Sequence, residues 1–234
     1  MPIFLIVFAA IFTQTVTGFG LALISMPLLA LVLPLQVAAP LVALFGGVAE
    51  VLLLLRYRAA LNVRAVAVLI AASMVGIPVG VYLLGQGDEG VVTAVLGVIV
   101  LVYALYALLG FRLPALTSRL WAVAFGFVAG ILGGAYNTSG PPVIIYGNCR
   151  RWPPAEFKSN LQGFFLVVSA IVIITHFFSG NITAVVWYNF FIAVPALLLG
   201  LFAGSYLDKY IDPLRFRRIV LLVLVCLGLS LIFI

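Results

Sequence analysis

Long apolar segments alternate with short polar linkers along the whole of this chain, and the pattern predicts membrane-spanning helices. Six segments have about the 20 residues that one helix needs to cross a bilayer. They fall at 36–55, 65–84, 91–111, 155–178, 184–206 and 216–234. Two further segments, 2–33 and 120–147, are each close to 30 residues long. A straight helix of that length would measure roughly 45 Å, well beyond the ~30 Å hydrocarbon core of a bilayer.

Both long segments contain a break. The stretch from Gly133 to Pro142 holds three glycines and two prolines in ten residues. Because Gly weakens a helix and Pro removes a backbone donor, this stretch is not expected to form a continuous helix. The polar run from Thr13 to Gly20, followed by Pro27, interrupts the first long segment in the same way. Irregular backbone at membrane depth is tolerated only inside protein or beside water, so the two breaks indicate a solute site.

The basic residues bear on whether each long segment crosses the membrane or returns as a re-entrant hairpin. If both cross, five Lys and Arg lie on one face and seven on the other. If both are hairpins, all 12 lie on one face, and the other face keeps the linkers around Asp88–Glu89 and Ser179–Asn181. The positive-inside rule favours the second arrangement. We therefore predict two hairpins and six full spans in the plasma (inner) membrane, with basic loops cytoplasmic and both termini outside.

The chain also repeats itself. Segment 76–83 recurs at 200–207 with the same spacing of two glycines and a tyrosine. We predict an all-α polytopic membrane protein of two repeats, residues 1–112 and 113–234, each a broken or re-entrant hairpin followed by three spans. An odd number of crossings turns the second repeat upside down, which is a recurrent transporter plan. Small-residue faces at Gly76/Gly80, Gly126/Gly130 and Gly200/Gly204 are expected to pack helices closely.

Composition excludes most other classes of protein. Hydrophobic residues make up 66% of the chain and charged residues 8%, which is not the composition of a soluble domain. The net charge of +6 arises in short loops beside apolar spans, so it indicates membrane orientation and no nucleic-acid partner. An enzyme would normally need clustered His, Asp, Glu or Cys. The single histidine and the separated Cys149 and Cys226 predict no enzyme, no metal site and no cofactor.

The second break resembles a motif of the sulfite exporter TauE/SafE family, and the likeness covers nearly the whole chain. It consists of a glycine series that runs into a polar stretch and a proline: Gly126-x-x-x-Gly130-x-x-Gly133-Gly134, then Pro141. Residues 17–27 echo the pattern in the first half, whereas Ala135-Tyr136-Asn137 replaces a third glycine and an apolar residue. The resemblance implies an integral membrane transporter of sulfite, sulfonates, sulfoacetate or related organic anions.

The two breaks supply chemistry that suits an anion. A half-helix that begins at mid-membrane presents unpaired N–H groups and the positive end of its dipole. Hydroxyls and amides beside it can donate to sulfonate or carboxylate oxygens. The predicted substrate-binding residues are Thr13, Gln14, Thr15, Thr17, Gly18, Gly20, Gly134, Tyr136, Asn137, Thr138, Ser139, Gly140, Asn160 and Gln162. The alternative is structural, since membrane Thr and Ser often bond their own helix and Asn and Gln often join neighbouring helices.

Glu50 is the carboxylate that falls inside an apolar span, and it is the candidate for proton coupling. The alternative is that Glu50 reaches the cytoplasmic interface near Arg56. His176 falls near the outer end of its span and is expected at the interface.

The function predicted from these features is secondary transport of a small anion by alternating access between the repeats. No ATP-binding motif is present, so the energy would come from an H⁺ or Na⁺ gradient or from the solute gradient itself. An anion channel of the same architecture and a non-transporting membrane scaffold subunit are the alternatives. The expected partners besides the solute are membrane lipids, and the predicted architecture is compatible with a homodimer.

Overall fold

The computed structural model describes residues 2–110 and 113–233, and all regular secondary structure in this part of the chain is helical. The prediction of an all-α protein is confirmed. The ten α-helices are α1 (Pro2–Thr17), α2 (Leu21–Ala30), α3 (Leu35–Tyr57), α4 (Val63–Gln86), α5 (Glu89–Leu109), α6 (Arg119–Tyr136), α7 (Gly140–Cys149), α8 (Pro154–Phe178), α9 (Ala184–Leu207) and α10 (Pro213–Ile232). Short 3₁₀ turns, η1 (Arg58–Ala60) and η2 (Asp208–Tyr210), follow α3 and α9.

Both predicted breaks are present, and the backbone shows their cause. Between α1 and α2, Gly18 and Gly20 have φ values of 83° and 120°, which side chains rarely allow. Asn137 ends α6 with φ of 53°, and its N–H donates to the Gly133 carbonyl at 2.8 Å. Asparagine is among the residues that tolerate this left-handed conformation. The first break is shorter than expected, because α1 stays helical through Thr17.

Six helices are long and apolar enough to cross a membrane, as predicted, but one member of the set differs. The candidates are Leu35–Leu55, Val63–Gln86, Glu89–Leu109, Arg119–Tyr136, Pro154–Phe178 and Ala184–Tyr210. Five coincide with predicted spans. The sixth candidate among the described residues is α6, which has 18 residues. Helix α10 is not a candidate, because it carries Arg215, Arg217 and Arg218 in its first two turns.

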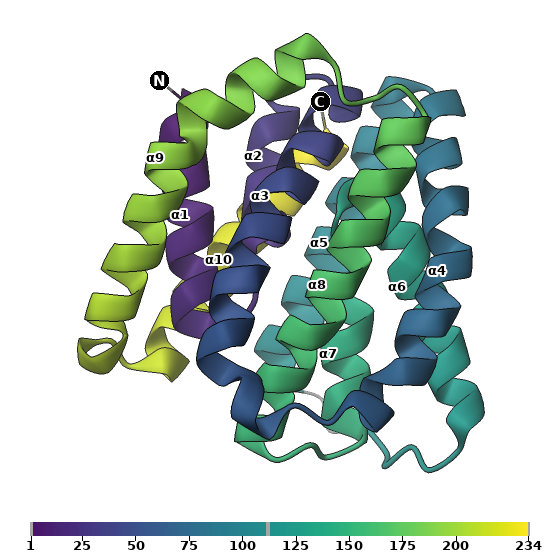
Figure 1. Cartoon of the computed structure of the whole chain (residues 1–234), viewed down its shortest axis with the longest axis vertical. Coiled ribbons are helices and arrows are strands. Elements are labelled where there is room, and N and C mark those ends of the chain that lie inside the picture. Colours follow the sequence, from purple (N-terminus) through teal and green to yellow (C-terminus); the bar gives the residue numbers. More distant parts are fainter. Residues whose placement is uncertain (1, 111–112, 234) are drawn as a thin grey trace.

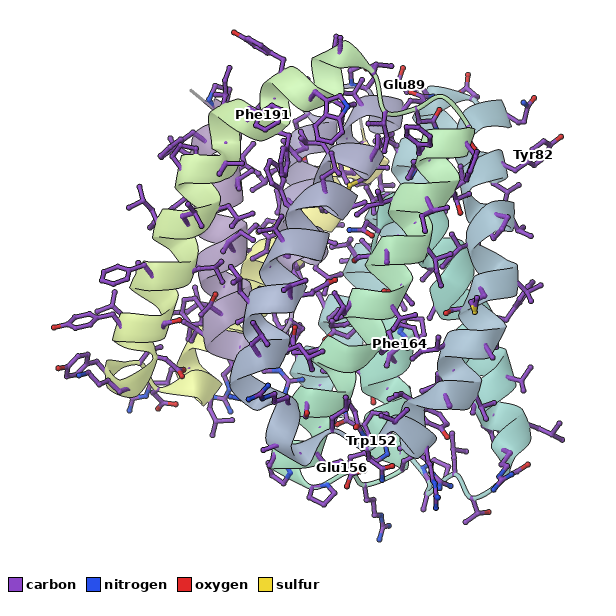
Figure 2. All side chains as sticks on the ribbon, in the orientation of Figure 1. Tyr82, Glu89, Trp152, Glu156, Phe164 and Phe191 are labelled. Atoms are coloured by element: carbon purple, nitrogen blue, oxygen red, sulfur yellow. The ribbon has the colours of Figure 1, made fainter. Side chains whose placement is uncertain are left out.

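The helices pack in pairs that come from opposite halves of the chain. Helix α4 packs along α6, α1 along α9, α5 along α10 and α3 along α8. Figure 1 shows the N-terminus, the C-terminus and the α2–α3 linker at one end of the molecule. The ends of α3, α5, α7 and α9 lie at the other end, with the starts of the helices that follow them. In Figure 2, Tyr82 and Glu89 mark the first end, and Trp152 and Glu156 mark the second.

Glycines bring α4 and α6 together backbone to backbone, which confirms the predicted small-residue faces. A Cβ added at Gly80 would strike the carbonyl of Ile131, and one at Gly130 would strike the carbonyl of Ser73. Gly204 meets the side chain of Thr15 in the α1–α9 pair. Close approach of small residues is how membrane helices gain packing without a hydrophobic driving force. These contacts hold the two broken segments against long helices.

Candidate functional site

The two breaks meet at one small cavity in the interior. Its volume is about 30 Å³, enough for about one water molecule. Residues of both breaks and of the long helices α3 and α8 form its wall: Gln14, Phe19, Gly20, Leu21, Ala22, Leu23, Glu50, Asn137, Thr138, Ser139, Gly140, Phe165 and Ser169. We call this space the central cavity. It brings together six of the predicted substrate-binding residues and the predicted coupling residue.

Gln14 connects the two sides of the first break. Its Oε1 atom accepts a hydrogen bond from the backbone N–H of Leu21 at 2.9 Å, so Gln14 caps the start of α2. The side chain is buried, and its Nε2 atom has no hydrogen-bond partner among the described residues. Gln14 therefore combines a structural role with a free donor in the cavity wall.

The second break contributes another free hydroxyl. Thr138 is 1% exposed, and its Oγ1 atom has no partner in the described part of the chain. Its N–H donates to the Leu132 carbonyl at 3.1 Å, which holds the residue in place after α6 ends. Ser139 follows as the N-cap of α7, and its side chain forms no capping hydrogen bond. Both hydroxyls are thus free of the local bonds that Ser and Thr usually make in helices.

Three polar side chains converge on the bare backbone of Gly46 in α3. A Cβ at Gly46 would lie 3.2 Å from Ser169 Oγ and 3.5 Å from both Asn137 Nδ2 and Glu50 Oε1. Glu50 is 5% exposed, and Ser169 hydrogen-bonds its side chain. Its Oε2 atom has no partner within the described residues. Glu50 thus faces the central cavity, contrary to the alternative that it reaches the cytoplasmic interface.

The N-termini of α2 and α7 both begin at the cavity, but they offer different numbers of donors. The amides of Ala22 and Leu23 lie in the first turn of α2, where a helix provides no carbonyl for them. In α7 the corresponding positions are Pro141 and Pro142, which have no N–H. The first turn of α7 therefore offers fewer N–H groups than that of α2, and Gly140 supplies one of them.

Several predicted binding residues lie outside the cavity because they serve the fold. The hydroxyls of Thr13, Thr15 and Thr17 each bond a carbonyl one turn back at 2.8 Å. The hydroxyl of Tyr136 donates to the carbonyl of Val92 at 3.0 Å. These are the structural roles that polar residues commonly take in membrane helices.

The remaining predicted binding residues also hold the fold together. Gly134 packs against the carbonyl of Ile77, and Gly18 lies at the turn between α1 and α2. Asn160 Oδ1 accepts a hydrogen bond from the N–H of Asn62 at 2.9 Å, and Gln162 Nε2 donates one to the Gly18 carbonyl at 2.8 Å.

Two features of the site were missed from the sequence. Ser169 and Phe165 line the cavity one helical turn apart on α8, and Gly46 of α3 lies beside Ser169. A serine inside an apolar span was the available signal.

His176 is placed in the last turn of α8 as expected, but it is fully buried instead of interfacial, with Nδ1 2.9 Å from Asn181 Nδ2.

Comparison with known proteins identifies the class of molecule. The family model described as sulfite exporter TauE/SafE matches residues 3–231. The chain is 29% identical over 234 residues to the probable sulfite/organosulfonate exporter TauE of Cupriavidus necator, covering 95% of this chain and 90% of that protein. It is 27% identical over 170 residues to the probable inner membrane transporter protein TsaS of Comamonas testosteroni, covering 72% and 71%.

No solved structure matches the chain significantly. The matching family consists of transporters, which settles that the chain is not an enzyme. The breadth of the family match and the six apolar helices agree with each other. This multi-pass membrane protein therefore belongs to the sulfite exporter TauE/SafE family of transporters.

Proposed function

We propose that the chain is a secondary transporter that carries a small sulfur-containing or organic anion, such as sulfite, a sulfonate or sulfoacetate, across the inner membrane. The names of the relatives from Cupriavidus necator and Comamonas testosteroni support the solute class and the membrane. The proposed binding site is the central cavity. Its proposed ligands are Gln14, Asn137, Thr138 and Ser139, with Glu50 beside them.

One observation carries the proposal: three residues that line the central cavity each have a buried polar atom without a partner among the described residues. These atoms are Gln14 Nε2, Thr138 Oγ1 and Glu50 Oε2. A buried polar atom without a partner costs about 1–3 kcal/mol, so a fold retains three of them together only where something else satisfies them. An amide and a hydroxyl are donors, and a protonated carboxyl is a third. The three oxygens of a sulfonate or sulfite are matching acceptors.

The helix termini favour the same sign of charge. The N-terminal ends of α2 and α7 both meet the cavity. A helix N-terminus carries up to roughly half a positive elementary charge, and that of α7 carries less because Pro141 and Pro142 have no N–H. Helix N-termini bind anions without a fixed cation. Since a solute held by dipoles and neutral donors can be released again, this arrangement suits transport better than tight storage.

The small size of the cavity supports alternating access over an open pore. A space of about 30 Å³ holds one water and is smaller than a sulfonate group. Movement of the helices must therefore enlarge it before the anion enters. A channel would need a continuous polar path instead, and the cavity walls include Phe19, Leu23 and Phe165.

The order and packing of the helices support two inverted repeats, 1–112 and 113–234. Each half consists of two shorter helices followed by three long ones. If α1 to α5 correspond to α6 to α10, then the α4–α6 contact corresponds to the α9–α1 contact. The α3–α8 and α5–α10 contacts each correspond to themselves. A pseudo-two-fold relation of this kind is typical of transporters whose halves rock against each other.

The distribution of charge supports a topology with two re-entrant hairpins. The Lys and Arg residues lie in sequence around the ends of α3, α5, α7 and α9, and Figure 1 shows these helix ends at one end of the molecule and both termini at the other. We propose that the basic end is cytoplasmic. Helices α1 and α2 then form a hairpin that enters from outside, and α6 and α7 form one that enters from the cytoplasm.

A flux assay in proteoliposomes tests the site. We expect wild-type protein to exchange ³⁵S-labelled sulfite against internal sulfite with saturable kinetics. Gln14→Leu and Thr138→Val should each lower kcat/KM by about 10-fold or more, because a hydrogen bond to a charged group contributes roughly 1.5–3 kcal/mol. Thr175→Val is the matched control, since the Thr175 hydroxyl bonds its own helix at Ile171.

Two results would refute the proposal. Equal exchange by wild type and the two cavity variants would show that the anion binds elsewhere. Non-saturating flux accompanied by single-channel currents would show a channel in place of a transporter.

A further inference from the structure

A second, larger hollow lies at the basic end of the molecule, between the C-terminal ends of α5 and α7 and the start of α10. Its volume is about 520 Å³. The side chains in its wall that can bind an anion are those of Tyr106, Asn148, Arg151 and Arg217. Two guanidinium groups, an amide and a phenol therefore face one space. We call it the basic vestibule.

Arg217, which lines this vestibule, has a side-chain donor without a partner. Its Nε atom is buried and has no hydrogen-bond partner among the residues that the structure describes. The guanidinium carbon lies 5.6 Å from the centre of the Phe19 ring, a cation–π contact. A ring face satisfies part of the charge but accepts little from a planar N–H fork, whereas an oxyanion matches that fork directly. The geometry favours an anionic occupant beside Arg217.

Phe19 links the vestibule to the central cavity. Its ring carries Arg217 on one side, and the residue also lines the central cavity. Tyr103 contacts the ring edge-on, with centroids 6.4 Å apart, and the buried Tyr103 hydroxyl has no partner in the described part of the chain. Phe19 lies between Gly18 and Gly20, both of which have positive φ. Because glycine allows many backbone conformations, the backbone on either side of Phe19 can rotate and move the ring.

We propose that the basic vestibule captures a sulfonate-type anion on the cytoplasmic face and that the Phe19 ring is the gate between it and the central cavity. The inference rests on the proposed transport function and assigns its entry site. An anion that binds Arg217 competes with the Phe19 ring for the guanidinium group. Capture therefore weakens the contact that holds the ring in place.

Capture of an anion can be measured with a thiol introduced into the vestibule wall by Ala107→Cys. The rate at which charged reagents label this thiol shows which charge the vestibule attracts. The probes are two methanethiosulfonates of similar size, one ending in a sulfonate and one in a trimethylammonium group. In purified protein we expect the sulfonate probe to react faster, and Arg217→Gln to lower the ratio of the two rates by ~5-fold or more at low salt. High salt should remove the difference. The parent protein measures the background from Cys149 and Cys226.

Ethanesulfonate in excess should slow labelling at position 107, and Arg217→Gln should abolish this protection while Arg217→Lys keeps part of it. A rate ratio that Arg217→Gln leaves unchanged, or protection that persists without the guanidinium group, overturns the capture site. The Gln14→Leu variant separates this inference from the function itself. If it loses sulfite exchange yet keeps the vestibule protection, the capture site stands independently of the central site.

The gate is tested in membrane vesicles with the basic end outward. Thr138→Cys places a thiol in the central cavity, and the sulfonate probe, which does not cross lipid, reaches it only from the vestibule side. Phe19→Ala should raise the labelling rate at least ~10-fold, and Phe19→Leu should raise it less because leucine still fills much of the gap. Equal rates in all three proteins, each verified as folded by size-exclusion chromatography, overturn the gate.

Discussion

The side-chain amide of Gln162 on α8 donates a hydrogen bond to the backbone carbonyl of Gly18 at 2.8 Å. The two residues are 144 positions apart, so a long helix of the second half fixes the break of the first half. Gln162 is fully buried, and the Gly18 carbonyl belongs to the turn that follows α1. A broken helix leaves such carbonyls without partners, and here a side chain from another segment supplies one.

Replacing Gln162 by leucine should therefore destabilise the first break. The substitution leaves the Gly18 carbonyl unsatisfied, which costs about 1–3 kcal/mol. We expect a lower thermal unfolding midpoint in detergent and weaker sulfite exchange. Thr175→Val, which alters a hydroxyl bonded within α8, supplies the control for substitution in that helix. An unchanged midpoint in Gln162→Leu would show that this hydrogen bond contributes little.

The hydrogen bond between Gln162 and Gly18 also shows which part of the site the sequence could predict. Two polar breaks in overlong apolar segments were sufficient to predict that helices end within 13–20 and 133–142, but not that α1 continues to Thr17 and α6 to Tyr136. The pattern could not tell which polar side chains face a solute, since Gln162 and Gln14 are both amides in apolar surroundings. Each amide bonds one neighbour and has one buried atom without a partner among the described residues. Only the packing places Gln14, and not Gln162, in the wall of the central cavity.

Ser169 shows why part of the site was missed. It belongs to a span with no break, and its relation to Glu50 and Asn137 arises from the way α8 packs on α3. A contact between residues so far apart in sequence leaves no local pattern. The glycine faces were easier to predict, because two small residues four positions apart suffice to let helices approach.

Asn137 has a conformational role and a chemical one, and two variants separate them. Asn137→Gly keeps the left-handed φ of 53° without strain, whereas Asn137→Ala should cost roughly 1–2 kcal/mol. We expect the thermal midpoint to fall only in Asn137→Ala. Sulfite exchange should fall in both variants, because both lose the Nδ2 donor. Full exchange by Asn137→Gly would restrict the residue to a backbone role.

Gly80 and Gly85 both lie on α4, but we predict that replacing them by alanine changes the stability in opposite directions. A Cβ at Gly80 would strike the Ile131 carbonyl and lie 2.8 Å from the Ala135 nitrogen, whereas nothing lies within 4 Å of one at Gly85. Gly80→Ala should cost about 1–3 kcal/mol or more by forcing α4 away from α6. Gly85→Ala should be neutral or stabilise by up to roughly 1 kcal/mol, because alanine favours a helix. Thermal unfolding of both variants in one detergent checks the contrast.

Glu50→Gln tests the coupling of transport to protons. Glutamine keeps the size of the side chain and offers a donor towards the cavity, but it cannot take up or release a proton. With an imposed proton gradient, we expect wild-type protein in proteoliposomes to accumulate labelled sulfite and Glu50→Gln to lose at least ~10-fold of that accumulation. Exchange of internal for external sulfite, which needs no net proton movement, should stay within about threefold of wild type.

Glu156→Gln is the matched control for this experiment, because Glu156 lies in the first turn of α8, away from the cavity, and accepts hydrogen bonds from Asn62 and Asn160. Its gradient-driven accumulation should match that of wild type. If Glu50→Gln still accumulates sulfite in response to the proton gradient, the carboxyl is not the coupling group. If it loses accumulation and exchange together, Glu50 contributes to binding or folding and the proton must travel by another route.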